Sequence, residues 1–186
     1  PLITESGGEA VELYNSGNDA VNISGYTIKT ASSNKDAVLP ENAVIPAEGY
    51  YLIADSNWFE KKDDVLYPVA DHEEAITMTN TAAGVALIDK NNNTIDKVGW
   101  GAISDHRLFS INPANRSENG ESLIRISFSG DNNADFISSE PELENSRGEN
   151  RDINANAIDI NVNVNDIGEY IQNISVDFDI DDKIFL

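Results

Sequence analysis

The chain has no cysteine, one methionine and two tryptophans among its 186 residues. Without cysteine it can form no disulfide, has no thiol nucleophile and offers no cysteine ligand to zinc. No run of eighteen apolar residues occurs, so the sequence predicts no membrane-spanning helix. A chain of this length can bury a sufficient core without disulfides, so an extracellular location stays open.

Basic residues are also scarce, with 12 lysines and arginines against 33 acidic residues and a net charge of −21. Phosphate contacts need clustered lysine and arginine, so we expect no direct binding to nucleic acid or to an anionic membrane surface. A solvated acidic surface that keeps the protein soluble explains the charge, and cation binding is the alternative.

The usual catalytic motifs are missing as well. The sequence holds no Gly-x-Ser-x-Gly elbow, phosphate-binding loop or dinucleotide fingerprint. His72 and His106 both lie beside acidic residues, but they are 34 positions apart and do not have metal-ligand spacing. We therefore expect a chain that is not an enzyme.

Short strands dominate what is present. Val11 and Leu13 alternate with Glu12, and Val21 and Ile23 alternate with Asn22, which is the period of a half-buried strand. The pattern predicts strands at 10–14, 20–23, 26–30, 50–54, 75–79, 84–89, 95–100 and 122–128. Between them, frequent turn signals are typical of a β-sandwich. The expected interior residues are Val11, Leu13, Ile23, Leu52, Leu87, Val98 and Leu123.

One short helix is expected at 56–62. Ser56 would cap it, and Trp58 and Phe59 would pack against the core. Lys61 and Lys62 suit its C-terminal end. No long amphipathic helix is predicted, which argues against an α/β enzyme fold.

Several segments together resemble the prokaryotic lamin-tail domain family over about residues 3–147. The first carries Glu12, Asn15, Gly17, Val21, Asn22, Ser24, Gly25 and Tyr26 in the family's order. Three further segments resemble its later strands: 45–53, 84–100 and 120–125. The resemblance implies an all-β, immunoglobulin-like β-sandwich that serves as an accessory module of a secreted protein.

The composition divides the chain into three parts. Residues 1–137 form the expected sandwich, and the polar stretch 138–150, with Pro141 and Gly148, reads as a linker. Residues 151–186 alternate strictly at 157–164 and 174–180, which predicts a β-hairpin or the start of a truncated second β domain. Open hairpin edges favour pairing with another copy, so a strand-exchanged homo-oligomer is expected.

Candidate ligands come from acidic and aromatic residues. Asp177 and Asp179 share one face of a predicted strand, and together with Asp181 just beyond it they are candidate calcium ligands, the only cofactor expected. Asp131 and Asp135 form a second acidic group. The stretch 89–96 has calcium-loop oxygen donors but lacks the required glycine and glutamate, so it predicts a hairpin turn.

Trp58 and Trp100 are the candidates for stacking on a sugar, although core packing is the commoner role of aromatic residues. Trp100 stands between Gly99 and Gly101, which leaves room for a close backbone or a ligand.

These features together predict a non-catalytic binding or spacer module of a secreted or cell-surface protein, attached to a protein or a surface polymer. One alternative is an accessory domain of an extracellular nuclease or other hydrolase whose catalytic part lies outside this sequence. Another is a carbohydrate-binding module.

The net charge of −21 makes a direct prediction about salt. Mutual repulsion between carboxylates destabilises the folded state, and salt screens it within a Debye length of about 8–10 Å. The midpoint of thermal unfolding should therefore rise between low and high NaCl. A midpoint that falls would contradict this, and calcium exceeding NaCl at equal ionic strength would indicate a specific calcium site.

Overall fold

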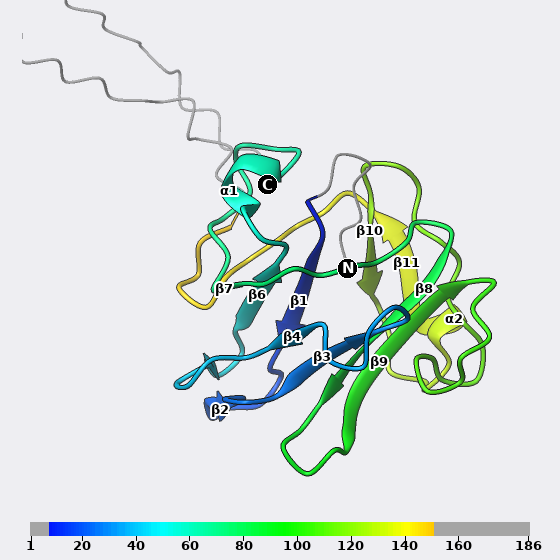
Figure 1. Cartoon of the computed structure of the whole chain (residues 1–186), viewed down its shortest axis with the longest axis horizontal. Helices are drawn as coiled ribbons and strands as arrows, with labels where there is room; N and C mark the ends of the chain where they lie inside the picture. The colour runs from blue at the N-terminus through cyan, green and yellow to red at the C-terminus, as the bar shows by residue number, and fades with distance from the viewer. Residues whose placement is uncertain (1–7, 151–186) are drawn as a thin grey trace, which may run out of the picture. The chain divides into compact units, whose positions relative to one another are not determined.

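A computed structural model of the chain describes residues 8–150, where short β-strands alternate with turns and two single-turn helices (Figure 1). The strands are β1 Ala10–Tyr14, β2 Val21–Asn22, β3 Thr27–Thr30, β4 Ala37–Val38, β5 Val44–Ile45, β6 Tyr50–Ala54, β7 His72–Glu73, β8 Ala82–Ile88, β9 Thr94–Gly101, β10 Ser122–Arg125 and β11 Phe136–Ser139. The helices are α1 Trp58–Lys61 and α2 Asn132–Asp135. The predicted all-β class is confirmed.

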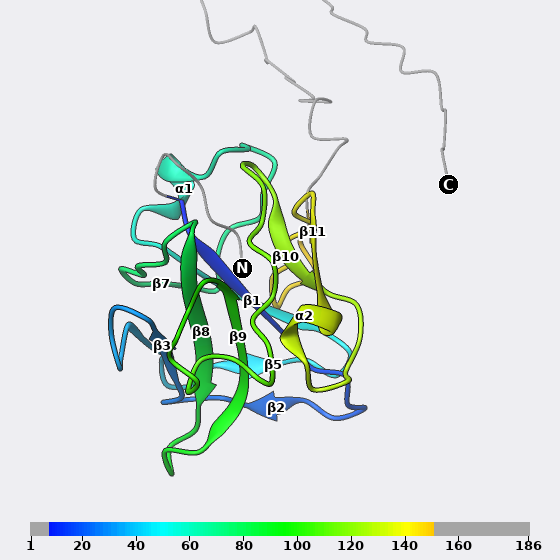
Figure 2. The same ribbon diagram turned by 90° about the vertical axis from the view of Figure 1, so that its right-hand side faces the viewer.

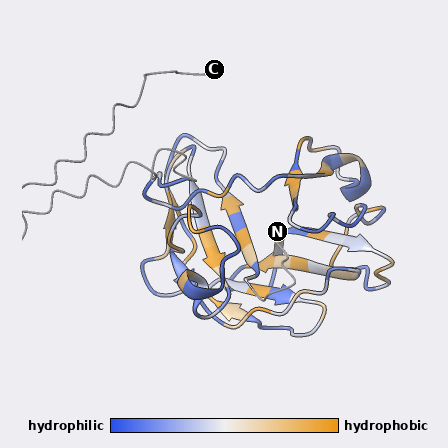
Figure 3. Ribbon diagram, turned by 90° about the horizontal axis from the view of Figure 1, so that it is seen from above, coloured by the Kyte–Doolittle hydropathy of each residue, from blue (hydrophilic) through white to orange (hydrophobic). Residues whose placement is uncertain are grey.

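Two sheets face each other across the main hydrophobic core (Figures 1 and 2). One has the order β4-β3-β8-β9 and the other β1-β6-β7. The core takes Val11 and Ile53 from the second sheet and Ile28, Val85 and Val98 from the first. Figure 3 shows hydrophobic residues concentrated along these strands, while the connecting loops are mostly hydrophilic.

The antiparallel pair β1–β6 is apolar on both faces. Val11 lies opposite Ile53, and both side chains enter the main core. On the other face, Ala10 lies opposite Ala54 and joins a second cluster under α1. This second cluster contains Ala10, Leu52, Ala54, Trp58, Tyr67, Ala70 and Leu143. A strand covered on both faces carries an unbroken apolar run, as β6 does.

In the sheet β4-β3-β8-β9, two facing glycines allow the loop that carries Leu108 and Phe109 to pack on the outer face. Gly84 and Gly99 are register partners in β8 and β9. A Cβ on Gly84 would lie 2.8 Å from the Cβ of Leu108, and one on Gly99 would lie 2.8 Å from the Cβ of Phe109. Leu108 is fully buried there, so the space beside Trp100 is filled by the protein's own loop.

The strand predicted at 75–79 is wrong. Ile76 and Met78 are buried in the core, but the segment pairs with no strand among the described residues. Its backbone amides donate instead to carboxylates: Ile76 to Asp55 at 3.3 Å, Thr77 to Asp36 at 3.1 Å and Met78 to Glu9 at 2.7 Å. Carboxylates take the place that a neighbouring strand's carbonyls would have.

The helix expected at 56–62 is present but shorter and differently capped. Asn57, not Ser56, is the N-cap, and it makes no side-chain capping bond. Trp58 is buried as expected, whereas Phe59 is 72% exposed. The pattern did not predict α2, whose N-cap Asp131 accepts a hydrogen bond from the Asn133 amide.

The expected linker 138–150 is also wrong, because this segment is part of the folded unit. β11 pairs with β10 through Ser139, and Leu143 is only 5% exposed in the second cluster. Asn145 is 1% exposed. The polar composition that suggested a linker reflects hydrogen bonding to the sandwich. Residues 151–186, predicted to form a hairpin, lie outside the described residues.

Most of the expected interior residues are buried, with two differences. Val11, Ile23, Leu87, Val98 and Leu123 belong to the main core. Leu13 is only partly buried at its margin. Leu52 is fully buried, but in the second cluster, because it lies opposite Glu12 on the outer face of β6. The alternation in the sequence predicted the correct strand period, but it placed Leu52 on the face of β6 that meets the main core, whereas Leu52 lies on the opposite face.

Replacing Ile53 by alanine tests the core. Ile53 is fully buried between the sheets, so Ile53→Ala should lower the free energy of unfolding by about 2–5 kcal/mol. Val65 is 84% exposed, and Val65→Ala should change it by less than about 0.5 kcal/mol. Chemical denaturation of both variants measures the difference, and equal small losses would contradict the core assignment.

Candidate functional site

The two tryptophans named as candidates for stacking on a sugar are both fully buried. The indole Nε1 of Trp58 donates to the carbonyl of Pro68 at 2.9 Å, and its ring stacks on Tyr67 with centroids 6.2 Å apart. Trp100 donates to the carbonyl of Thr79 at 2.9 Å. Neither presents a face to solvent, so the sugar-stacking assignment at Trp58 and Trp100 is corrected to core packing.

The two histidines have separate partners. His72 lies on β7, with its Nε2 3.2 Å from Glu74. His106 lies in the loop after β9 and packs on Phe109 with ring centroids 4.8 Å apart. Nothing in these contacts joins the two histidines into one site.

The acidic residues of the two candidate motifs in residues 8–150 stabilise turns by accepting hydrogen bonds from backbone amides. Asp89 accepts hydrogen bonds from the amides of Asn91 and Asn93, which confirms the hairpin turn between β8 and β9. Asp135 accepts from the amides of Ser129 and Gly130. Within residues 8–150, no group of three histidine or acidic residues is arranged to hold a metal. The calcium candidates Asp177, Asp179 and Asp181 lie outside that range.

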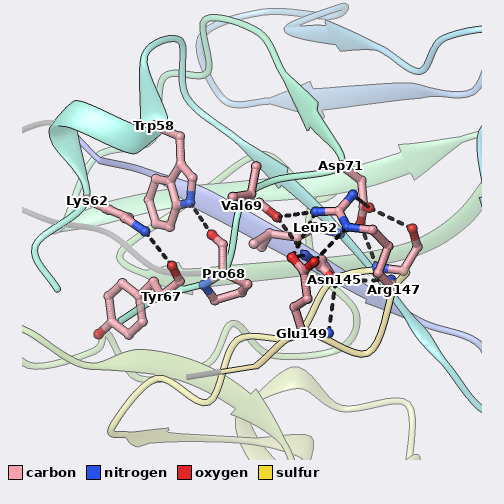
Figure 4. Close-up of polar contacts among 11 residues, drawn as sticks. Leu52, Trp58, Lys62, Tyr67, Pro68, Val69, Asp71, Asn145, Arg147 and Glu149 are labelled. Carbon is pink, nitrogen blue, oxygen red and sulfur yellow. Dashed lines mark hydrogen bonds and ion pairs between the residues drawn. The ribbon is translucent and has the colours of Figure 1, made fainter. Parts of the chain in front are cut away.

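A polar clasp, formed by residues 143–149 held against residues 67–71, is a group of side-chain contacts that the sequence did not predict (Figure 4). Asp71 is at its centre. One carboxylate oxygen accepts from the Leu52 and Ser146 amides, both at 2.8 Å, and the other accepts from the Ser146 hydroxyl at 2.6 Å. The guanidinium of Arg147 lies 3.5 Å from Asp71. One buried carboxylate thus joins β6 to the end of the described chain.

Asn145 completes the clasp. Its Nδ2 donates to the Val69 carbonyl at 2.9 Å and to Glu149 at 2.6 Å, and its Oδ1 accepts from the Arg147 and Glu149 amides. Arg147 also pairs with Glu149 at 3.0 Å. With every polar atom of its side chain satisfied, the buried asparagine fixes the turn at 145–149.

Glu12 of β1 binds the segment 143–149 at a second point. Its carboxylate accepts a hydrogen bond from the Glu144 amide at 2.6 Å. Burial raises the pKa of Glu12 to about 7, and the nearby carboxylates of Glu142 and Glu144 add to the rise. Burial likewise raises the pKa of Glu9 to about 7, against the lowering effect of its bond from the Met78 amide.

Two depressions on the described surface lie near residues already discussed. One depression of about 440 Å³ lies between the 40–46 loop, Tyr51 and the clasp residues Asp71 and Ser146. A smaller pocket of about 240 Å³ lies where the turn after β2 meets the turn after β8. The larger depression has a mixed polar and apolar lining, and the Ser146 hydroxyl in its wall donates to the Asp71 carboxylate at 2.6 Å. The smaller pocket is lined by polar side chains and Tyr26.

The lamin tail domain family matches residues 3–102, just over half of the chain. The chain belongs to the lamin tail domain family. Its immunoglobulin-like sandwich is a non-catalytic fold, in agreement with the resemblance seen in the sequence. Among curated proteins and solved structures, nothing matches the chain.

The folded unit of this lamin tail domain extends beyond the family match. Leu108, Leu123 and Leu143 all follow residue 102, and each is buried in the core or its covering layers. The signal that could have revealed this cover is the unbroken run Tyr50–Ala54, because such a run needs apolar contacts on both faces. No comparable signal marks Asn145 or Asp71.

In the part of this lamin tail domain that the structure describes, none of the helices has the length and apolar character needed to cross a membrane.

The raised pKa of Glu12 makes a prediction about pH. The folded protein keeps a proton that the unfolded chain releases between about pH 4.5 and 7, so stability falls as pH rises through this window. Glu12→Gln removes the charge and keeps an oxygen for the Glu144 amide. It should stabilise the protein by roughly 1–3 kcal/mol at pH 8 and much less at pH 4, since one pKa unit is about 1.4 kcal/mol.

Urea unfolding at both pH values measures this difference. Glu60→Gln, at an exposed position of α1, is the matched control and should show no such trend. A Glu12→Gln effect of equal size at both pH values would contradict a raised pKa.

Proposed function

We propose that this lamin tail domain is a non-catalytic binding module of a secreted or cell-surface protein. In this proposal it presents the pole opposite the two ends of the described range 8–150 to a protein or a surface polymer. Binding beside an extracellular nuclease or other hydrolase domain would be the same role in a larger protein.

The observation that carries this proposal is where residues 8 and 145–149, near the two ends of the described range, lie. Gly8 lies against the backbone of Lys61, where an added Cβ would be 2.8 Å from the carbonyl oxygen. The Asn145–Glu149 turn is bound to Val69, and the neighbouring Pro68 carbonyl accepts from Trp58 of α1. Both ends of the described chain therefore contact the segment 58–71, at the α1 end of the sandwich (Figures 1 and 2).

This arrangement favours display over spacing. A spacer lengthens a protein when the chain enters at one pole and leaves at the other. A domain whose ends meet at one pole projects sideways and leaves the opposite pole free. That distal pole holds β2 and the turn between β8 and β9 (Figure 1). Loops at one end of an immunoglobulin-like sandwich are a common place for binding residues.

A photo-reactive label tests which pole binds. Asn92 is exposed at the tip of the β8–β9 turn, and Phe59 is 72% exposed on α1 at the other pole. The full chain labelled at one position or the other would be mixed with purified surface polymers and secreted proteins, and cross-linked products analysed by mass spectrometry. We expect adducts from Asn92 and none from Phe59. Adducts from Phe59 alone, or from neither label, would contradict the proposal.

A further inference from the structure

The smaller pocket lies at the distal pole and is built by two turns that the fold brings together. It has a volume of about 240 Å³ and is lined by Asn22, Ser24, Tyr26, Asp89, Lys90 and Asn91. Pockets for drug-sized molecules are roughly 300–1,000 Å³, so this one suits a smaller ligand or one unit of a polymer.

Ser24, which lines this pocket, carries a buried hydroxyl without a hydrogen-bond partner among the described residues. Ser24 is 3% exposed, and within residues 8–150 its hydroxyl is the one buried side-chain oxygen or nitrogen that lacks a hydrogen-bond partner. A buried polar group without a partner costs about 1–3 kcal/mol. Because the hydroxyl oxygen is itself buried, a ligand oxygen would satisfy it after a small shift of the pocket wall.

Asn22 is held in a fixed orientation beside Ser24. Its Oδ1 accepts a hydrogen bond from the Ser24 amide at 2.9 Å. The amide nitrogen of Asn22 keeps two donors, since the described residues give it no acceptor. Asn22 therefore offers donors at a position set by the backbone.

Lys90 and Asp89 add charges of opposite sign. The Cε of Lys90 lies 2.9 Å from the place that a Cβ on Gly25 would take, and Gly25 has φ +69°. A side chain at position 25 would displace Lys90, so the glycine makes room for it. No carboxylate of residues 8–150 forms an ion pair with Lys90. Hydrogen bonds from Asn93 lower the pKa of Asp89 and keep it ionised.

We propose that this pocket binds one neutral saccharide unit of a surface polymer, with Asn22, Ser24, Asp89 and Lys90 as its polar contacts. A sugar hydroxyl both donates and accepts, which matches adjacent donors and acceptors in a small space. A neutral ligand is also not repelled by a protein of net charge −21. This inference rests on the proposed function, because it names the ligand class of the same distal pole.

Calorimetric titration of the full chain with a panel of neutral monosaccharides and short oligosaccharides tests the proposal. Lys90→Met removes the ammonium, and Asn22→Ser removes the amide donors while keeping an oxygen for the Ser24 amide. Each variant should bind about tenfold more weakly than the unaltered chain. Lys35→Met is the matched control, since Lys35 lies in the 31–36 loop outside the pocket, and should bind unchanged.

Thermal unfolding of each variant confirms that it is folded. Binding that is lost in Lys90→Met and Asn22→Ser but kept in Lys35→Met supports the site. The absence of saccharide binding, or binding unaffected by both pocket variants, overturns it. If the label at Asn92 still captures a partner in that case, the binding function stands and only the saccharide pocket is wrong.

Discussion

The rest of this structure depends on the burial of the β1–β6 pair on both of its faces. One face meets the opposite sheet, and the other needs cover that the sandwich strands do not supply. α1, the segment 67–70 and Leu143 provide that cover in the second cluster. The need to cover Leu52 and Ala54 explains why the chain returns along β1 after β11 and why the polar clasp holds it there.

Carboxylates solve a second problem, which is the satisfaction of backbone amides in segments that have no strand partner. Glu9, Asp36 and Asp55 accept from the amides of residues 76–78, and Glu12 and Asp71 do the same for the clasp. Part of the acidic excess therefore belongs to the hydrogen-bonded framework and not to a solvated surface. Burial of Glu9 and Glu12 is costly, and their raised pKa values record that cost.

The same framework supports the proposal that the distal pole is the one that meets a partner. Because the clasp brings the end of the described chain to the pole where β1 begins, α1 and its neighbours are occupied by structural contacts. The clasp and the second cluster do not involve the turns at the distal pole. Among residues 8–150, the hydroxyl of Ser24 has no hydrogen-bond partner and the ammonium of Lys90 has no ion-pair partner, unlike the satisfied network around Asp71.

The sequence by itself determined the strand period, the all-β class, the lamin-tail resemblance and the turn at Asp89, because these depend on local alternation and turn chemistry. It also placed most of the core, since Val11, Val98 and Leu123 follow that alternation. Local sequence patterns do not predict which segments far apart in the chain will pair. Only the tertiary structure decided that Leu52 faces a second cluster, that residues 138–150 belong to the domain, and that Phe59 stays exposed beside the buried Trp58. The physical reason is that burial and hydrogen-bond satisfaction depend on neighbours far along the chain, as Asn145 and Val69 show.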